Sequence, residues 1–158
     1  MKLDPDLKLV ILEKVGIYSE RPIILDGLTQ GETHFLTIAA KNAYGTSDHT
    51  EMLGVVPSYH PVSCLIVNGF DRMNGTNNTL DFIRHHGSAL HAGGYSFDSA
   101  SNEAVINENI SLNDYQFLDW ILGEEGSETS TFTSVEQNRV ESYLENGRFL
   151  FVSGSEIG

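Results

Sequence analysis

The sequence predicts an α/β protein in two parts. Residues 1–58 are expected to form a partial β-sandwich, and residues 59–158 a three-layer α/β domain with a parallel sheet, incomplete at its C-terminus. Two observations support this. Short apolar runs separated by turn residues fill the first part, as in sandwiches. In the second part, apolar runs alternate with amphipathic helical patterns, which indicates parallel strands joined by right-handed crossovers.

The first part is expected to hold four short strands. Each is a run rich in branched or apolar side chains, the residue types that favour extended backbone. The later runs are flanked by turn residues or by a proline. The expected strands are residues 7–12, 22–25, 34–40 and 52–56.

The second part begins with the apolar run 64–70, which has no polar face. Such a run is typical of a strand buried on both sides of a parallel sheet, so we expect it to be central and fully buried. Apolar residues at helical spacing over 80–90 then predict a helix that ends at Gly93 and Gly94. A short helix over 101–107 and a buried strand over 117–122 are expected to follow.

The last helix and strand have the clearest local signals. Thr133 and Glu136 have the spacing of a capping box, in which each side chain satisfies a backbone group at the start of the helix. Gly147 is expected to end this helix. A third parallel strand is then expected over residues 148–152.

The segment LTQGETHFLTIAAKNAYGTSD resembles the later strands of a fibronectin type III domain. The matching positions are Leu28, Gly31, Leu36, Ile38, Ala40, Asn42, Gly45 and Ser47. Gln30 replaces the usual proline of that pattern, and His34 stands where the family has its corner tyrosine. The resemblance implies that a ring nitrogen of His34 makes a hydrogen bond to the backbone. A complete domain of this kind needs about 100 residues, so its early strands are expected to be missing.

Residues 60–158, and especially DWILGEE and TFTSVEQNRVESYLENGRFLFVSGSEIG, resemble the class I glutamine-amidotransferase-like, flavodoxin-like fold. Together with the fibronectin-like segment, this resembles large secreted bacterial proteins labelled putative xanthan lyase or N-acetylmuramoyl-alanine amidase. The resemblance implies an extracellular or cell-surface location and polysaccharide or peptidoglycan as partner. Glu156 stands where that fold has its cysteine nucleophile, and Ser155 is one position early. Glutamine hydrolysis is therefore not expected.

Charge and hydropathy exclude some partners. The net charge of -13 repels phosphate backbones, so nucleic acid is not expected as a partner. No apolar run approaches the roughly 20 residues of a membrane span, and the first residues lack the apolar core of a signal peptide. The single cysteine, Cys64, is expected to be a buried, inert thiol. His85, His86 and His91 are expected to be surface residues, because their spacing suits no shared metal.

A candidate site follows from the ends of the predicted strands. Ligands of open α/β sheets bind beyond the carboxyl ends of the strands. The side chains expected there are Asn68, Asp71, Arg72, Glu124, Glu125, Ser155 and Glu156. Gathered carboxylates would serve as acid and base, or bind calcium or magnesium, or simply form a solvated acidic edge. Glu156, Glu124 and Ser155 are the candidate catalytic residues. The candidates for ligand binding are Asn68, Asp71, Arg72, Glu124 and Glu125.

Two functions are compatible with these features. The first is a binding or architectural role in a secreted multidomain protein, without self-sufficient catalysis. The alternative is part of a polysaccharide lyase or cell-wall hydrolase that uses the edge carboxylates. Because unpaired strands recruit others, we also expect a homo-oligomer, or else packing of Leu9, Ile11, Ile24 or Leu36 against the α/β part.

Overall fold

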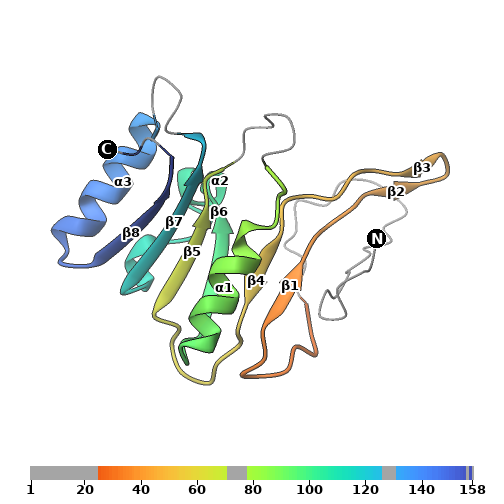
Figure 1. Cartoon of the computed structure of the whole chain (residues 1–158), viewed down its shortest axis with the longest axis horizontal. Helices are drawn as coiled ribbons and strands as arrows, with labels where there is room; N and C mark the ends of the chain where they lie inside the picture. The colour runs from red at the N-terminus through yellow and green to blue at the C-terminus, as the bar shows by residue number, and fades with distance from the viewer. Residues whose placement is uncertain (1–24, 71–77, 126–130, 156, 158) are drawn as a thin grey trace.

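The computed structural model describes residues 25–70, 78–125, 131–155 and 157. Its centre is a four-stranded parallel sheet in the order β6-β5-β7-β8 (Figure 1). The strands are β5 (Cys64–Asn68), β6 (Phe97–Ser101), β7 (Phe117–Gly123) and β8 (Phe149–Gly154). An α/β architecture with a parallel sheet is thus confirmed at this level.

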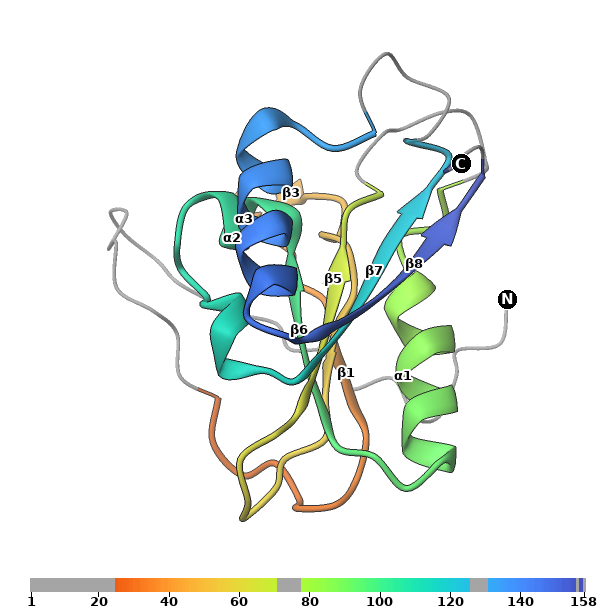
Figure 2. The ribbon, with the colours of Figure 1, turned by 90° about the vertical axis from the view of Figure 1, so that its left-hand side faces the viewer.

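Helices lie on both faces of this sheet. In Figure 2, α1 is on one side, and α2 and α3 are on the other. The helices are α1 (Phe82–Ala92), α2 (Asn102–Ile106) and α3 (Ser134–Glu145), with a short 3-10 helix η1 (Leu112–Asp114) before β7. The capping box of α3 is formed as predicted. Thr133 N donates to Glu136 Oε2 at 2.7 Å, and Glu136 N donates to Thr133 Oγ1 at 3.3 Å.

The strand predicted to be central is central. β5 lies between β6 and β7, and all five of its residues are buried. Successive side chains of a strand point to opposite faces. Cys64 and Ile66 accordingly join the apolar cluster under α1, whereas Leu65 and Val67 join the cluster under α2 and α3. Both faces of β5 are therefore core, which explains the absence of a polar side in its sequence.

The sheet has one parallel strand more than the sequence analysis predicted. β6 was missed because only Phe97 in its sequence FDSAS is large and apolar. It is held by its parallel pairing with β5. On its other side, the Ser99 hydroxyl donates to the Gly54 carbonyl and accepts from the Gly54 amide, each at 2.6 Å. Tertiary pairing, rather than local sequence preference, makes this segment a strand.

The N-terminal part forms two antiparallel pairs. β1 (His34–Leu36) pairs with β4 (Leu53–Val55), and β2 (Lys41–Asn42) pairs with β3 (Gly45–Thr46). The predicted strand over 34–40 is therefore shorter than expected. His34 is buried, and its Nε2 lies 2.9 Å from the carbonyl oxygen of Thr29, so the expected hydrogen bond to the backbone is confirmed.

This N-terminal part packs directly on the α/β part. Val56 N, just after β4, donates to Phe97 O at 2.9 Å, so β4 runs beside β6. Phe35, Met52 and Val56 share one core cluster with residues of β5, β6 and α1. Leu36 was expected to pack against the α/β part, but it is half-buried, and its neighbour Phe35 packs there instead. Leu9, Ile11 and Ile24, the other residues expected to make such contacts, lie outside the described residues.

Candidate functional site

The carboxyl edge of the sheet holds some of the predicted site residues. Asn68 ends β5, is buried, and donates a hydrogen bond from Nδ2 to Glu51 Oε2. Glu124 and Glu125 follow β7 and are half-buried. Ser155 follows β8, and its N–H donates to the Gly123 carbonyl at 2.7 Å. The contact of Asn68 with Glu51, a residue of the N-terminal part, was not foreseen.

The rest of the predicted edge site is not described. Asp71, Arg72 and Glu156 lie outside the described residues, so the expected gathering of four carboxylates stays a prediction. Across residues 25–70, 78–125 and 131–155, the histidine, cysteine and acidic side chains form no group of three that could hold a metal ion. Calcium or magnesium binding at this edge likewise stays a prediction.

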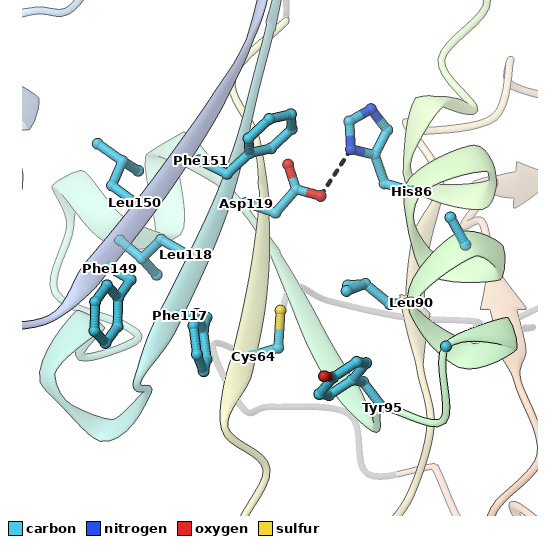
Figure 3. A pocket seen from close by; sticks show the side chains of 12 residues that line it. Cys64, His86, Leu90, Tyr95, Phe117, Leu118, Asp119, Phe149, Leu150 and Phe151 are labelled. Atoms are coloured by element: carbon cyan, nitrogen blue, oxygen red, sulfur yellow. Dashed lines mark hydrogen bonds and ion pairs between the residues drawn. The ribbon is translucent and has the colours of Figure 1, made fainter.

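The structure shows a second site that the sequence analysis missed. α1 packs over β4, β5 and β6, while Phe117, Phe149 and Phe151 on the same face of β7 and β8 stay exposed. The result is a groove of about 510 Å3 between α1 and the open part of the sheet (Figure 3). We call it the aromatic groove. Its lining includes Leu90 and His86 from α1 and the alternating residues Phe117, Asp119, Phe149 and Phe151 from β7 and β8.

The floor of the aromatic groove is unusually open for phenylalanine. The exposed fractions of Phe117, Phe149 and Phe151 are 45%, 56% and 62%. Phe117 and Phe149 are directly opposite each other in the pairing of β7 with β8. Their rings stack with centroids 5.2 Å apart and an interplanar angle of 20°. Clustered exposed aromatic side chains of this kind mark binding surfaces more often than isolated ones do.

One carboxylate lies in the groove among these rings. Asp119 is buried, and His86 reaches it from α1, with Nδ1 2.7 Å from Asp119 Oδ2 (Figure 3). Because a carboxylate only accepts hydrogen bonds, the proton of this bond belongs to His86 Nδ1. His86 is half-buried, only partly the surface residue that was expected, whereas His85 and His91 are exposed as expected. Asp119 Oδ1 is buried and makes no hydrogen bond within the described part of the chain.

Cys64 also lines the groove and is buried, as predicted. Burial, and then the nearby negative charges of Asp119 and Asp98, raise the pKa of its thiol to about 11. At neutral pH it is therefore protonated, and a protonated thiol is a poor nucleophile. Cys64 is therefore not an activated nucleophile, and the hydrogen bond of His86 Nδ1 is with Asp119.

One signal in the sequence could have revealed this site. Asp119 interrupts the apolar run FLDWIL, and a carboxylate inside a buried strand needs a partner. The rest of the groove depends on where α1 lies on the sheet, which sequence periodicity does not give.

Comparisons with models of protein families, with curated proteins and with solved structures each found no match to this chain. Among the helices that the structure describes, none has the length and apolar character needed to cross a membrane.

Proposed function

We propose that this chain is a binding module of a secreted bacterial multidomain protein, and that it holds a neutral carbohydrate in the aromatic groove without self-sufficient catalysis. One observation carries this proposal. Exposed, stacked phenylalanine rings lie beside a buried carboxylate oxygen that lacks a hydrogen-bond donor in the described residues. A sugar is complementary to both features. The apolar C–H face of a sugar ring can stack on the phenylalanine rings, and its hydroxyl groups can donate hydrogen bonds to the carboxylate oxygen.

The groove has the composition and size of a small-molecule site. Such sites are mostly apolar or aromatic, contain a few placed polar groups, and have volumes of roughly 300–1,000 Å3. The aromatic groove, at about 510 Å3, has three phenylalanines and the His86–Asp119 pair. A ligand hydroxyl that reached Asp119 Oδ1 would satisfy an oxygen whose unpaired burial costs about 1–3 kcal/mol. Because Phe151 is largely exposed, movement of its ring would open the way to this oxygen.

Charge favours a neutral ligand over an acidic one. The chain carries a net charge of -13, and Asp119 adds a carboxylate inside the groove. A uronic acid or a phosphate would be repelled by both. Neutral hexoses and N-acetylated sugars avoid this repulsion and keep their hydrogen-bond donors.

The family resemblances of the sequence also favour a secreted bacterial multidomain protein. A parallel sheet with helices on both faces and an antiparallel β1–β4 pair are compatible, at this coarse level, with an amidotransferase-like part and a fibronectin-like part. The secreted location and the polysaccharide or peptidoglycan partner rest on those resemblances. The alternative, a lyase or hydrolase that uses Glu124 and Glu156, rests on sequence position alone, because Glu156 is outside the described residues.

Calorimetric titration with chitotetraose and cellotetraose tests this proposal, with tetragalacturonate as the acidic comparison. The two neutral oligosaccharides should bind, and the acidic one should bind more weakly. Phe117→Ala should raise the dissociation constant of the neutral sugars about fivefold, since an aromatic contact is worth ~1 kcal/mol and 1.4 kcal/mol is a factor of ten. Tyr44→Ala, at a fully exposed aromatic residue next to β2, is the matched control and should leave binding unchanged. Absence of binding at millimolar sugar, or equal binding by Phe117→Ala, would contradict the proposal.

A further inference from the structure

The aromatic groove has two chemically different ends. In the register of the sheet, Cys64 of β5, Phe117 of β7 and Phe149 of β8 lie side by side. Two residues further along β7 and β8, Asp119 and Phe151 again lie side by side. Residues two apart on a strand share one face of the sheet and are separated by about 7 Å. The two rows therefore follow one another along the floor of the groove.

The wall formed by α1 repeats this division. His86 and Leu90 are four residues apart, so they lie on the same side of the helix, one turn from each other. In Figure 3, His86 is level with Asp119, and Leu90 is level with Cys64. We call the part around His86, Asp119 and Phe151 the polar end. The apolar end is formed by Cys64, Leu90, Tyr95, Phe117 and Phe149.

The polar end needs a hydrogen-bond donor. Asp119 Oδ2 is bonded to His86 Nδ1, whereas the buried Oδ1 accepts no hydrogen bond within the described part of the chain. A carboxylate oxygen that is removed from water is normally paired with a donor. A hydroxyl group of a bound sugar supplies this donor.

The apolar end needs a different chemical group. Phe117 and Phe149 stack on each other there, and Leu90 lies on the α1 side. The Cys64 thiol is protonated at neutral pH, because burial raises its pKa to about 11. The other polar group at this end of the described lining is the hydroxyl of Tyr95, a residue with an exposed fraction of 57%. A sugar hydroxyl packed against these side chains would lose its water without an equivalent partner, which is unfavourable.

We infer that the groove binds a neutral sugar that carries an apolar substituent. A hydroxyl of the sugar donates to Asp119 Oδ1 at the polar end, and the substituent packs against Leu90, Phe117 and Phe149 at the apolar end. This inference rests on the proposed function and narrows its ligand class. A plain hexose, which has hydroxyl groups around its whole rim, satisfies the polar end only.

An apolar substituent of this kind has two sources. It is either an aglycone linked to the anomeric carbon or an acyl group on the sugar itself, such as an acetamido group. Both present the same chemistry to the apolar end, namely carbon atoms without a hydroxyl at a distance from the donor of about 7 Å, the spacing of the two rows.

Calorimetric titration with three glycosides tests the inference. They are methyl β-glucoside, phenyl β-glucoside and the methyl β-glycoside of N-acetylglucosamine. The phenyl glucoside should bind about tenfold more tightly than the methyl glucoside, because burial of roughly 55 Å2 of additional apolar surface accounts for a factor of ten. A tenfold gain for the acetamido sugar instead would assign the substituent to an acyl group. Equal dissociation constants for all three glycosides would overturn the inference.

Two phenylalanines of β8 provide a matched pair of variants. Phe149 and Phe151 are both more than half exposed, and they lie at opposite ends of the groove. Phe149→Ala removes part of the apolar end, so the tenfold preference for the phenyl glucoside should fall to about one. Phe151→Ala should change the two dissociation constants alike and keep their ratio. A ratio that changes equally in both variants would contradict the assignment of the two ends.

Two further titrations separate this inference from the proposed function. Phenol alone should bind more weakly than phenyl glucoside, and equal binding would overturn the inference, because the polar end would then contribute nothing. If cellotetraose and chitotetraose bind but the three glycosides bind equally, the inference fails and the proposed function stands. If no saccharide binds at millimolar concentration, the proposed function fails as well.

Discussion

Replacing Gly87 by alanine should push α1 away from the sheet. A Cβ atom at this position would lie 2.4 Å from Phe97 Cζ and 3.0 Å from Cε1 and Cε2 of the same ring. Carbon atoms in contact are normally about 3.5–4.0 Å apart. Phe97 is fully buried, so its ring has little room to withdraw, and the helix must move by about 1 Å.

The expected net effect is a destabilisation of about 1 kcal/mol. Overpacking of a core costs about 1–3 kcal/mol, whereas alanine improves helix propensity over glycine by about 1 kcal/mol. For a chain of this length, 1 kcal/mol lowers the midpoint of thermal unfolding by about 2–4 °C. Calorimetry or circular dichroism would measure this shift.

Two further variants separate overpacking from other effects. Ser88→Ala, at an exposed position of the same helix, should change the free energy of unfolding by less than about 0.5 kcal/mol. Phe97→Leu removes the ring atoms that the new methyl group meets, so the double variant Gly87→Ala/Phe97→Leu should lose less stability than the two single variants added together. A higher unfolding midpoint for Gly87→Ala would refute the reasoning, because propensity would then outweigh packing.

Three other predictions concern the capping box, the groove and the thiol. Thr133→Ala should cost about 1 kcal/mol in chemical denaturation, because the Glu136 amide loses its acceptor; an unchanged denaturation midpoint would argue that the capping box is not formed in solution. Asp119→Asn should weaken the binding of neutral sugars, while an equally conservative His85→Gln on the exposed side of α1 should not. Cys64 should resist iodoacetamide at pH 8 in the folded chain and react on unfolding; labelling as fast as that of the unfolded chain would contradict this. Because the folded pKa of its thiol, about 11, exceeds the unfolded value, this group should not change the free energy of unfolding below about pH 9. Above that pH, the free energy of unfolding should fall as the pH rises toward 11.

The parts of the fold that could be predicted have signals in the local sequence. β5 is a continuous apolar run because both of its faces are core, and α3 begins at a capping box whose two hydrogen bonds involve only Thr133 and Glu136. The turn between β2 and β3 is also local, since Asn42 Oδ1 accepts hydrogen bonds from the amides of Tyr44 and Gly45. In each case a few neighbouring residues decide the conformation, and the sequence shows them.

The parts that were missed depend on distant residues. β6 is a strand because of its pairing with β5 and because Ser99 bonds to Gly54, which lies 45 residues earlier in the chain. The His86–Asp119 pair joins residues 33 positions apart on a helix and a strand. The placement of Asn68 at a strand end could be predicted, because strand ends follow from the topology of the sheet. Its hydrogen-bond partner Glu51 could not, because Glu51 belongs to the N-terminal part. Contacts at such separations leave no periodic signal.

The position of α1 connects the N-terminal part to the groove. β4 extends the apolar face beyond β6, and Phe35 and Val56 add to the cluster that α1 covers. The close approach at Gly87 holds the helix over Phe97 rather than over β7. With α1 placed toward β4, Phe117 on β7 and Phe149 and Phe151 on β8 stay open to solvent on this face. The N-terminal strands therefore shape the groove although they contribute no residue to its lining.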